Sequence, residues 1–231
     1  IYFFLSILHH FLNINLSVKD LLLDITSINL DFDPLIQESK FQTVQKIKDA
    51  CTTTGFFSIS NHGVPIEVLY SCLESSIKFF RQSESEKMKV GMPFPGYPYG
   101  FVPMEQETLA RSKGKSAAPD LKESFSIGPG LKSPPWLSAE EAQFVFSENQ
   151  WPENPKDFKN SWEICYKSLS ECSDKVMKLL ALALNLPENW FEGFFLNPIS
   201  AMRVNYYPEL VKEPQDNQLR ASAHSDYGSL T

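Results

Sequence analysis

The sequence lacks the cysteine pattern of a disulfide-stabilised or zinc-binding protein. It has four cysteines in 231 residues, namely Cys51, Cys72, Cys165 and Cys172. None lies in a C-x-x-C pair, and the chain is too long for a small domain held together by disulfides. A protein with reduced thiols, located in the cytoplasm, is therefore expected.

The sequence also lacks an excess of basic charge. It carries 21 Lys and Arg against 28 Asp and Glu, which gives a formal net charge of −7 at pH 7. An acidic surface repels the phosphates of nucleic acids and the head groups of anionic membranes. We therefore expect neither as a partner. A monomer is also expected.

No apolar run is long enough to span a membrane. The most apolar segment, IYFFLSILHHFLNINL, is interrupted by His9, His10 and Asn13, and a spanning helix needs about 20 apolar residues. It also lacks the basic start and the small-residue cleavage site of a signal peptide. Residues 1–24 are therefore treated as a doubtful apolar leader, either a fragment edge or misassigned upstream sequence.

Hydrophobic periodicity predicts alternating strands and helices in the next hundred or so residues. We expect strands in DITSINLDF and DLKESFSIGP, a strand and turn in GFFSISNHGVP, and helices over 41–52 and after Pro65. The apolar face of the second helix is expected to comprise Leu69, Cys72, Leu73, Ile77 and Phe80. The Pro- and Gly-rich stretch 91–107 predicts a loop without regular structure.

A long helix and then strands are predicted in the last third. The helix runs from about Pro155 to Leu184, with Cys165 and Cys172 on its buried stripe. These thiols are separated by about 10 Å of helical rise, too far for a disulfide. Strands follow in SAMRVNYYPEL and ASAHSDYGSLT, so an α+β chain with a β-rich end is predicted.

Polar residues at alternate positions of these last strands are candidates for chemistry. His224 and Asp226 should lie on one side of their strand, where nitrogen and oxygen donors suit a divalent metal such as Fe(II). Arg203, Asn205 and Tyr207 should likewise share a face. The alternative is an ordinary strand-end His and Asp that hydrogen-bond to neighbours, beside a half-buried sheet.

Four ordered segments together carry a family resemblance. They are GFFSISNHGVP, KFFRQSESEKMKV, DLKESFSIG, and MRVNYYPEL followed by AHSDYGSLT. In this order they resemble the isopenicillin-N-synthase-like group of Fe(II)- and 2-oxoglutarate-dependent dioxygenases, over about residues 25–231.

The resemblance implies an α+β fold in which a mixed amino-terminal region and a long helix lead into a truncated double-stranded β-helix (jelly-roll) core. The implied regions are 25–130 for the non-haem dioxygenase amino-terminal region, 131–197 for connecting loops and the long helix, and 198–231 for the start of the core.

The resemblance also implies roles for individual residues. His224 and Asp226 match two iron ligands, Asn205 and Tyr207 match positions lining the 2-oxoglutarate pocket, and Arg203 matches a basic residue near the prime substrate. The implied reaction uses Fe(II), 2-oxoglutarate and O2 to oxidise or oxygenate a small organic substrate, while 2-oxoglutarate is decarboxylated to succinate and CO2. His62 is expected to serve only a structural turn.

The sequence departs from the family pattern after Asp226. The family's distal His ligand and its Arg-x-Ser are not found in residues 227–231, and the chain does not start with Met, so an inactive amino-terminal fragment is expected. The alternatives are a non-catalytic module with a degenerate metal site, a 2-oxoglutarate-independent oxidase of the same family, or a different metal-dependent hydrolase.

Overall fold

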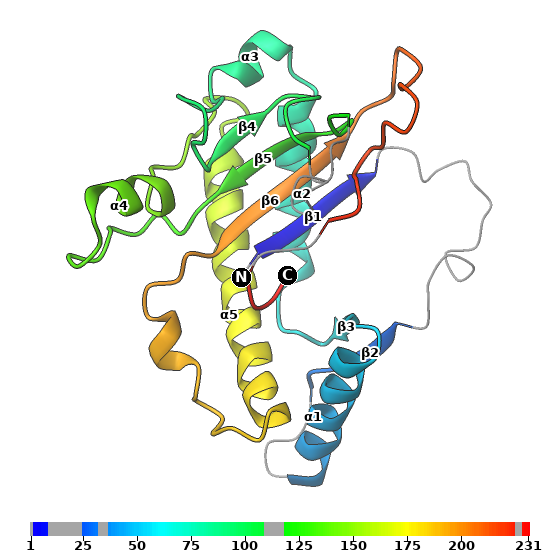
Figure 1. The fold of residues 1–231 in the computed structure, drawn as a ribbon, viewed down its shortest axis with the longest axis vertical. Helices are drawn as coiled ribbons and strands as arrows, with labels where there is room; N and C mark the ends of the chain where they lie inside the picture. Colours follow the sequence, from blue (N-terminus) through cyan, green and yellow to red (C-terminus); the bar gives the residue numbers. More distant parts are fainter. Residues whose placement is uncertain (1, 9–24, 32–36, 109–117, 225–227) are drawn as a thin grey trace. The chain divides into compact units, whose positions relative to one another are not determined.

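The computed structural model describes residues 2–8, 25–31, 37–108, 118–224 and 228–231 (Figure 1). The chain divides into two compact units. The first comprises residues 1–11, 70–166 and 197–231, and the second comprises residues 12–69 and 167–196. None of the helices in the described ranges is both long and apolar enough to cross a bilayer.

A four-stranded sheet forms the first unit, in the order β1-β6-β5-β4. Its strands are β1 (Tyr2–Leu8), β4 (Gly100–Val102), β5 (Glu123–Ile127) and β6 (Ala201–Tyr207). β6 runs parallel to β1 and antiparallel to β5, and β5 runs antiparallel to β4. The strands predicted around β5 and β6 are confirmed, while a closed jelly roll is not seen among the described strands.

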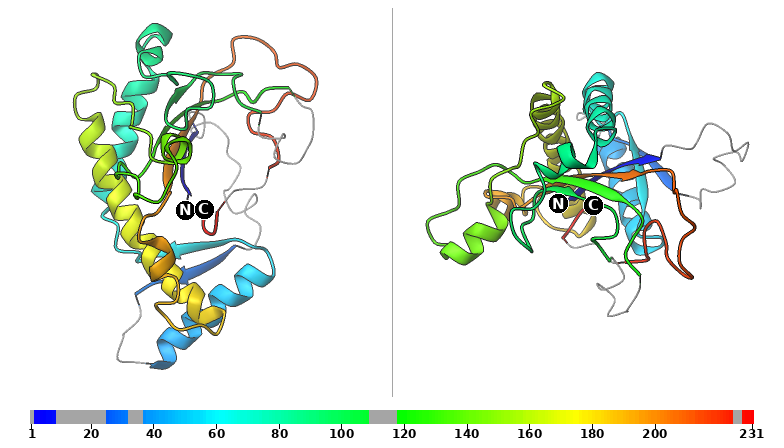
Figure 2. Two further views of the ribbon diagram at one scale, coloured as in Figure 1. Left: turned by 60° about the vertical axis from the view of Figure 1, so that its left-hand side comes forward. Right: turned by 90° about the horizontal axis from the view of Figure 1, so that it is seen from above.

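One face of this sheet carries an aromatic core. Phe125 of β5 and Val204 of β6 are fully buried there, because alternate residues of a strand point to the same side. They pack beneath α2 (Ile66–Phe80) and α5 (Phe158–Ala183), whose portions within this unit lie side by side on one face of the sheet (Figure 2). Trp162 meets Phe125 edge-on at 5.0 Å between ring centroids.

Hydrogen bonds between α2 and α5 cross this core. The Trp162 Nε1–H donates to Ser76 Oγ at 3.1 Å, and the hydroxyls of Ser75 and Ser161 lie 2.7 Å apart. The thiols of Cys72 and Cys165 also hydrogen-bond, and this bond together with burial raises the pKa of Cys72. We call these three pairs the α2–α5 polar ladder.

The buried face of α2 therefore differs from the predicted one. Its buried residues are Cys72, Ser75, Ser76, Phe79 and Phe80, whereas the predicted members Leu69, Leu73 and Ile77 are only partly buried. Ser75 and Ser76 are small enough for α5 to approach closely, and their hydroxyls hydrogen-bond to Ser161 and Trp162. The buried face of α2 therefore contains polar residues, and a search for apolar periodicity does not identify it.

Cys165 and Cys172 are both buried and form no disulfide with each other, as predicted. Of the four thiols only Cys51 is exposed. Burial raises the pKa of Cys172 against the opposing charge of Lys175, so its thiolate, the reactive form, is scarce.

We expect the exposed thiol of Cys51 to react quickly with a disulfide reagent such as DTNB in the folded protein. The three buried thiols should react only when the protein unfolds locally or globally. Cys51→Ser should remove the fast phase and leave the slow phase unchanged. Rapid modification of more than one thiol without denaturant would contradict this burial pattern.

Several short elements were not predicted. β4 lies within the stretch predicted as a loop, where Phe101 is buried and pairs with Phe125 of β5. The helices α3 (Glu84–Met88) and α4 (Ala139–Val145), the 3-10 helix η3 (Glu192–Phe195) and strand β1 in the leader were also missed. The strand expected at the carboxyl end is not formed in residues 221–224 and 228–231, which are irregular.

The second unit has a two-stranded parallel sheet and its own small core. The sheet joins β2 (Thr26–Asn29) to β3 (Phe57–Ser60), and α1 (Gln37–Thr52) precedes β3. The core residues are Ile28, Val44, Ile47, Leu179 and Ala183. These elements match the predictions for 24–60.

The turn after β3 is structural, as expected for His62. Asn61 and Gly63 have positive φ angles of 52° and 83°, which glycine and asparagine tolerate best. The Nδ1 atom of His62 accepts the backbone N–H of Val64 at 3.1 Å. The imidazole therefore holds the turn.

Candidate active site

The sheet face opposite the aromatic core is polar. Ser126 pairs in register with Arg203, and Ser124 pairs with Asn205. Because side chains alternate along strands, these four share one face with Lys122, just before β5. We call these five residues the polar face. The common face predicted for Arg203 and Asn205 is confirmed, and Tyr207 follows at the end of β6, half-buried.

Arg203 is held in place on the polar face by two neighbours. Its Nε–H donates to Ser126 Oγ at 2.8 Å, and its Nη1 donates to both carboxylate oxygens of Glu107, at 2.8 and 3.0 Å. The ammonium of Lys122 pairs with the same carboxylate. Burial alone would raise the pKa of Glu107, but the charges and hydrogen bonds of Arg203 and Lys122 outweigh it and hold that pKa below its usual value.

Two buried polar atoms of this face have no hydrogen-bond partner among the described residues: Ser124 Oγ and Asn205 Oδ1. Ser124 is 1% exposed and Asn205 is 8% exposed. Leaving such a group unsatisfied costs about 1–3 kcal/mol, and native proteins contain few of them. Their adjacency in register marks a place where a polar ligand would complete the hydrogen bonding.

The segment that carries His224 is hydrogen-bonded to the residues just before β5. The backbone N–H of Leu121 donates to the Leu219 carbonyl at 2.9 Å, and the N–H of Ser222 donates to Asp120 Oδ1 at 2.8 Å. The start of β5 in turn pairs with the end of β6, where Glu123 is opposite Tyr206. The His224 segment is therefore fastened near the end of the sheet that carries Asn205 and Tyr207.

His224 itself is exposed, and its Nδ1 lies 2.8 Å from the Ser222 carbonyl oxygen. A carbonyl only accepts hydrogen bonds, so Nδ1 carries the proton and the lone pair of the neutral ring is on Nε2, the tautomer common in metal-binding histidines. Asp226, the other predicted ligand, lies outside the described residues. No group of three His, Cys, Asp or Glu suitable for a metal is found within the described ranges.

Four residues of the site were not predicted from the sequence: Glu107, Lys122, Ser124 and Ser126. The alternation in DLKESFSIG was a signal for the last three, because it places Lys122 and both serines on one side of a strand. Glu107 had no such signal, since it lies outside any regular element and meets Arg203 across 96 residues of sequence.

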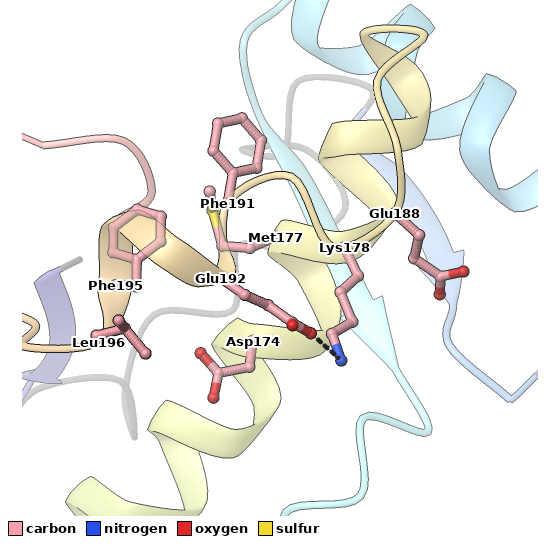
Figure 3. Close-up of a pocket in the computed structure, with 8 residues that line it drawn as sticks. All are labelled: Asp174, Met177, Lys178, Glu188, Phe191, Glu192, Phe195 and Leu196. Atoms are coloured by element: carbon pink, nitrogen blue, oxygen red, sulfur yellow. Dashed lines mark ion pairs between the residues drawn. The ribbon is translucent and has the colours of Figure 1, made fainter.

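A pocket of about 350 Å³ lies in the second unit (Figure 3). Its lining consists of Asp174, Met177, Lys178, Glu188, Phe191, Glu192, Phe195 and Leu196. Lys178 Nζ lies 3.0 Å from Glu192 Oε1, and burial raises the pKa of Asp174. With three carboxylates, one lysine and no histidine, this pocket suits neither Fe(II) bound by imidazole nor a dicarboxylate, and it contains none of the predicted site residues.

Residues 29–154 match the family model described as the amino-terminal region of the non-haem dioxygenase in morphine synthesis. Among curated proteins, a 2-oxoglutarate-Fe(II) type oxidoreductase, hxnY, of Emericella nidulans is 27% identical over 211 residues, covering 87% of this chain and 58% of that protein. A homoarginine-6-hydroxylase, 2-ODD-C23.1, of Arabidopsis thaliana is 31% identical over 194 residues, covering 82% of this chain and 56% of that protein.

Solved structures show the same likeness. A full-length protein of Neurospora crassa, crystallised in complex with alpha-KG, matches with a TM-score of 0.69 and 26% identity, covering 89% of this chain and 62% of that one. A 2OG-Fe(II) oxygenase family protein from Caulobacter crescentus shares the fold, with a TM-score of 0.66 and 23% identity, covering 82% of this chain and 58% of that one.

The chain thus spans less than two thirds of the length of each of these four proteins. The matched family model covers more than half of the chain, and the resemblance seen in its motifs is confirmed. The chain belongs to the 2-oxoglutarate–Fe(II) dioxygenase family.

Proposed function

We propose that the protein takes part in the Fe(II)- and 2-oxoglutarate-dependent oxidation or oxygenation of a small organic substrate, coupled to decarboxylation of 2-oxoglutarate to succinate and CO2. Family membership supports this, as do a relative described as a homoarginine-6-hydroxylase and a similar structure described as a complex with alpha-KG. Bound Fe(II), with O2 and 2-oxoglutarate, supplies the oxidising chemistry, while the chain binds and orients the reactants.

The observation that carries the proposal is the unsatisfied pair on the polar face. The Ser124 hydroxyl can donate to a carboxylate, and the Asn205 amide can present either its oxygen or its NH2, since a half-turn of the side chain exchanges them. A carboxylate or keto oxygen of 2-oxoglutarate would satisfy both residues. Tyr207, next but one along β6, would extend the same proposed binding site.

Iron would be held by His224 together with Asp226. The support is the tautomer of His224 set by Ser222, and the fastening of its segment beside the end of the sheet that carries Asn205 and Tyr207. Arg203, fixed by Ser126 and Glu107, would face the prime substrate.

The same proposal covers the setting of the reaction. We propose that the protein acts as a cytoplasmic monomer on a small molecule, without nucleic acid or membrane, which suits its net charge of −7.

Ser124→Ala and Asn205→Leu test the proposed co-substrate site. Each is expected to weaken 2-oxoglutarate binding by about 10- to 100-fold, since a hydrogen bond to a charged group contributes about 1.5–3 kcal/mol. Neither should lower the free energy of unfolding, because each removes a buried polar atom that has no partner among the described residues. Ligand-observed NMR with 2-oxoglutarate and Mn(II), and urea unfolding, measure the two effects.

The matched control is Ser173→Ala on α5. Ser173 also buries a hydroxyl that lacks a partner among the described residues, but it belongs to the other unit. It should leave 2-oxoglutarate affinity unchanged. Equal affinity for 2-oxoglutarate in all three variants would show that the co-substrate does not bind at the polar face, and it would favour a non-catalytic module.

A further inference from the structure

The segment that leads to His224 is attached to three consecutive residues before β5. Residues 119–121 each hydrogen-bond to residues 218–222, at distances of 2.8 to 3.0 Å. Two of these bonds use backbone atoms of residues 119–121, but the third uses the Asp120 carboxylate, whose Oδ1 accepts the N–H of Ser222. A carboxylate accepts a stronger hydrogen bond than a neutral carbonyl does. Asp120 is therefore expected to be the strongest of the three attachment points.

Asp120 is itself held in a fixed place. It is 1% exposed. Its N–H donates to the Glu107 carbonyl at 2.8 Å, and its carbonyl accepts the N–H of Glu105 at 3.3 Å. Both backbone groups of Asp120 and its carboxylate are thus engaged, just before β5 begins at Glu123. A carboxylate with so little freedom can orient the group that it binds, as the residues that support metal ligands do.

Ser222 passes this orientation on to His224. Ser222 is buried, its N–H is bound by Asp120, and its carbonyl oxygen lies 2.8 Å from Nδ1 of His224. Only the φ and ψ angles of Ser222 separate its N–H from its carbonyl, so fixing the N–H limits where the carbonyl can point. The carbonyl in turn accepts the Nδ1–H of His224 and leaves the lone pair of the neutral imidazole on Nε2.

We propose that Asp120 is a positioning residue for His224. By binding the Ser222 N–H across 102 residues of sequence, Asp120 sets the direction of the Ser222 carbonyl, and with it the tautomer and the orientation of the imidazole. The inference rests on the proposed function, which makes His224 a ligand of Fe(II). It deepens that function by adding a residue that acts through a backbone group and not by contact with the metal.

The tautomer can be measured in the 231-residue chain without any metal. Long-range 1H–15N correlation NMR distinguishes a protonated from an unprotonated ring nitrogen, at about pH 8 and so above the usual histidine pKa of about 6.5. His224 should be protonated at Nδ1. His62 is the internal reference, because its Nδ1 accepts the Val64 N–H and its proton is therefore on Nε2. The two histidines should show opposite patterns in one spectrum.

Substitutions of Asp120 test whether it controls this tautomer. Asp120→Leu should convert His224 to a mixture of tautomers and leave His62 unchanged, because the Ser222 N–H loses its acceptor. Asp120→Asn keeps an oxygen at the same position and should retain the Nδ1–H tautomer of His224. If Asp120→Leu does not fold, Asp120→Glu carries the test, because its longer side chain displaces the carboxylate and should also give a mixture.

Gln218→Leu is the matched control. Gln218 is also buried and holds the same segment, but its side-chain NH2 donates to Glu105 and to the Pro119 carbonyl and not to Ser222. The loss of these bonds removes a general attachment of the segment without freeing the Ser222 N–H. The tautomer of His224 should therefore stay the same in Gln218→Leu.

Metal binding gives a second readout. Mn(II) added without 2-oxoglutarate should broaden the ring signals of His224. Asp120→Leu should raise the Mn(II) concentration needed for this broadening by about tenfold, the lower end of the range for residues that support metal ligands. Asp120→Asn should raise it less, and Gln218→Leu should leave it unchanged.

The outcomes distinguish this inference from the proposed function. An unprotonated Nδ1 of His224 in the unmodified chain, a tautomer that survives Asp120→Leu, or an equal change in Gln218→Leu would overturn the inference. A tautomer that depends on Asp120 supports the inference even if Mn(II) leaves the His224 signals unaffected. In that case only the iron site of the proposed function fails.

Discussion

Lys87→Met is expected to lower the free energy of unfolding by about 3–5 kcal/mol at neutral pH, as for the loss of one partner from a buried ion pair. Lys87 Nζ lies 2.7 Å from both carboxylate oxygens of Glu123, and the two side chains are 7% and 11% exposed. Methionine retains the packing against Phe101, over which the ammonium lies at 5.1 Å from the ring centroid. It leaves the Glu123 carboxylate buried without its cation.

The loss of unfolding free energy in Lys87→Met, here called the deficit, should be larger at neutral pH than at acidic pH. Burial raises the pKa of Glu123, and Lys87 opposes that rise. When the pKa of a carboxyl is raised in the folded state, the free energy of unfolding of the protein falls as the pH rises. The fall runs from the pKa of the unfolded state, about 4.3, through the pKa of the folded state. Without Lys87 the folded pKa rises further, so the deficit should be largest at neutral pH and should shrink toward pH 4.

Lys89→Met is the matched control for this measurement. Lys89 pairs with Glu86 at 2.7 Å, but these side chains are 62% and 45% exposed, and such pairs contribute about 0–1 kcal/mol. Urea unfolding of both variants at pH 7 and pH 5 gives the comparison. Equal losses in the two variants, or a Lys87→Met deficit that grows on acidification, would contradict the buried-pair account.

Trp162→Ala is expected to cost about 3–5 kcal/mol, the range for deleting a large aromatic side chain from a core. Trp162 is fully buried, stacks on Phe158 at 4.9 Å between centroids, and donates its Nε1–H to Ser76. Trp162→Phe should cost less, since it keeps an aromatic ring and loses mainly the hydrogen bond. Urea unfolding followed by circular dichroism measures both.

Trp136→Ala provides the control, because Trp136 is 73% exposed and surface changes usually stay within about 0.5 kcal/mol. A comparable loss for Trp136→Ala, or a Trp162→Ala loss of the size expected for a surface change, would show that the aromatic core does not dominate the stability of the first unit.

Elements with a strong hydrophobic period were predictable from the sequence. α5 and β6 were expected within a few residues of their observed bounds, because each buries one regular stripe or face. α2 was predicted in position but not in its buried face. Burial of Ser75 and Ser76 depends on Trp162 and Ser161, which lie 86 residues away in the sequence, and no local pattern contains that information.

The candidate site was predictable to the same limited extent. A period of two placed Arg203 and Asn205 on a common face of β6, and the structure agrees. The ion pairs that fix Arg203 could not be predicted, because Glu107 reaches it from a segment without regular structure. The strand predicted for His224 does not form in the described residues of that segment. Its backbone groups are satisfied instead by contacts such as the one from Ser222 to Asp120.

The α2–α5 polar ladder has a consequence for movement during binding. If one helix slid along the other by a single turn, about 5.4 Å, all three hydrogen bonds would break together: Ser75–Ser161, Ser76–Trp162 and Cys72–Cys165. Their polar atoms would then be buried in the core without partners. A purely apolar contact would resist such a slip far less. The helical layer therefore acts as a fixed support in this unit, and any adjustment to an incoming substrate has to come from the opposite side of the sheet, where Glu107 lies outside regular structure.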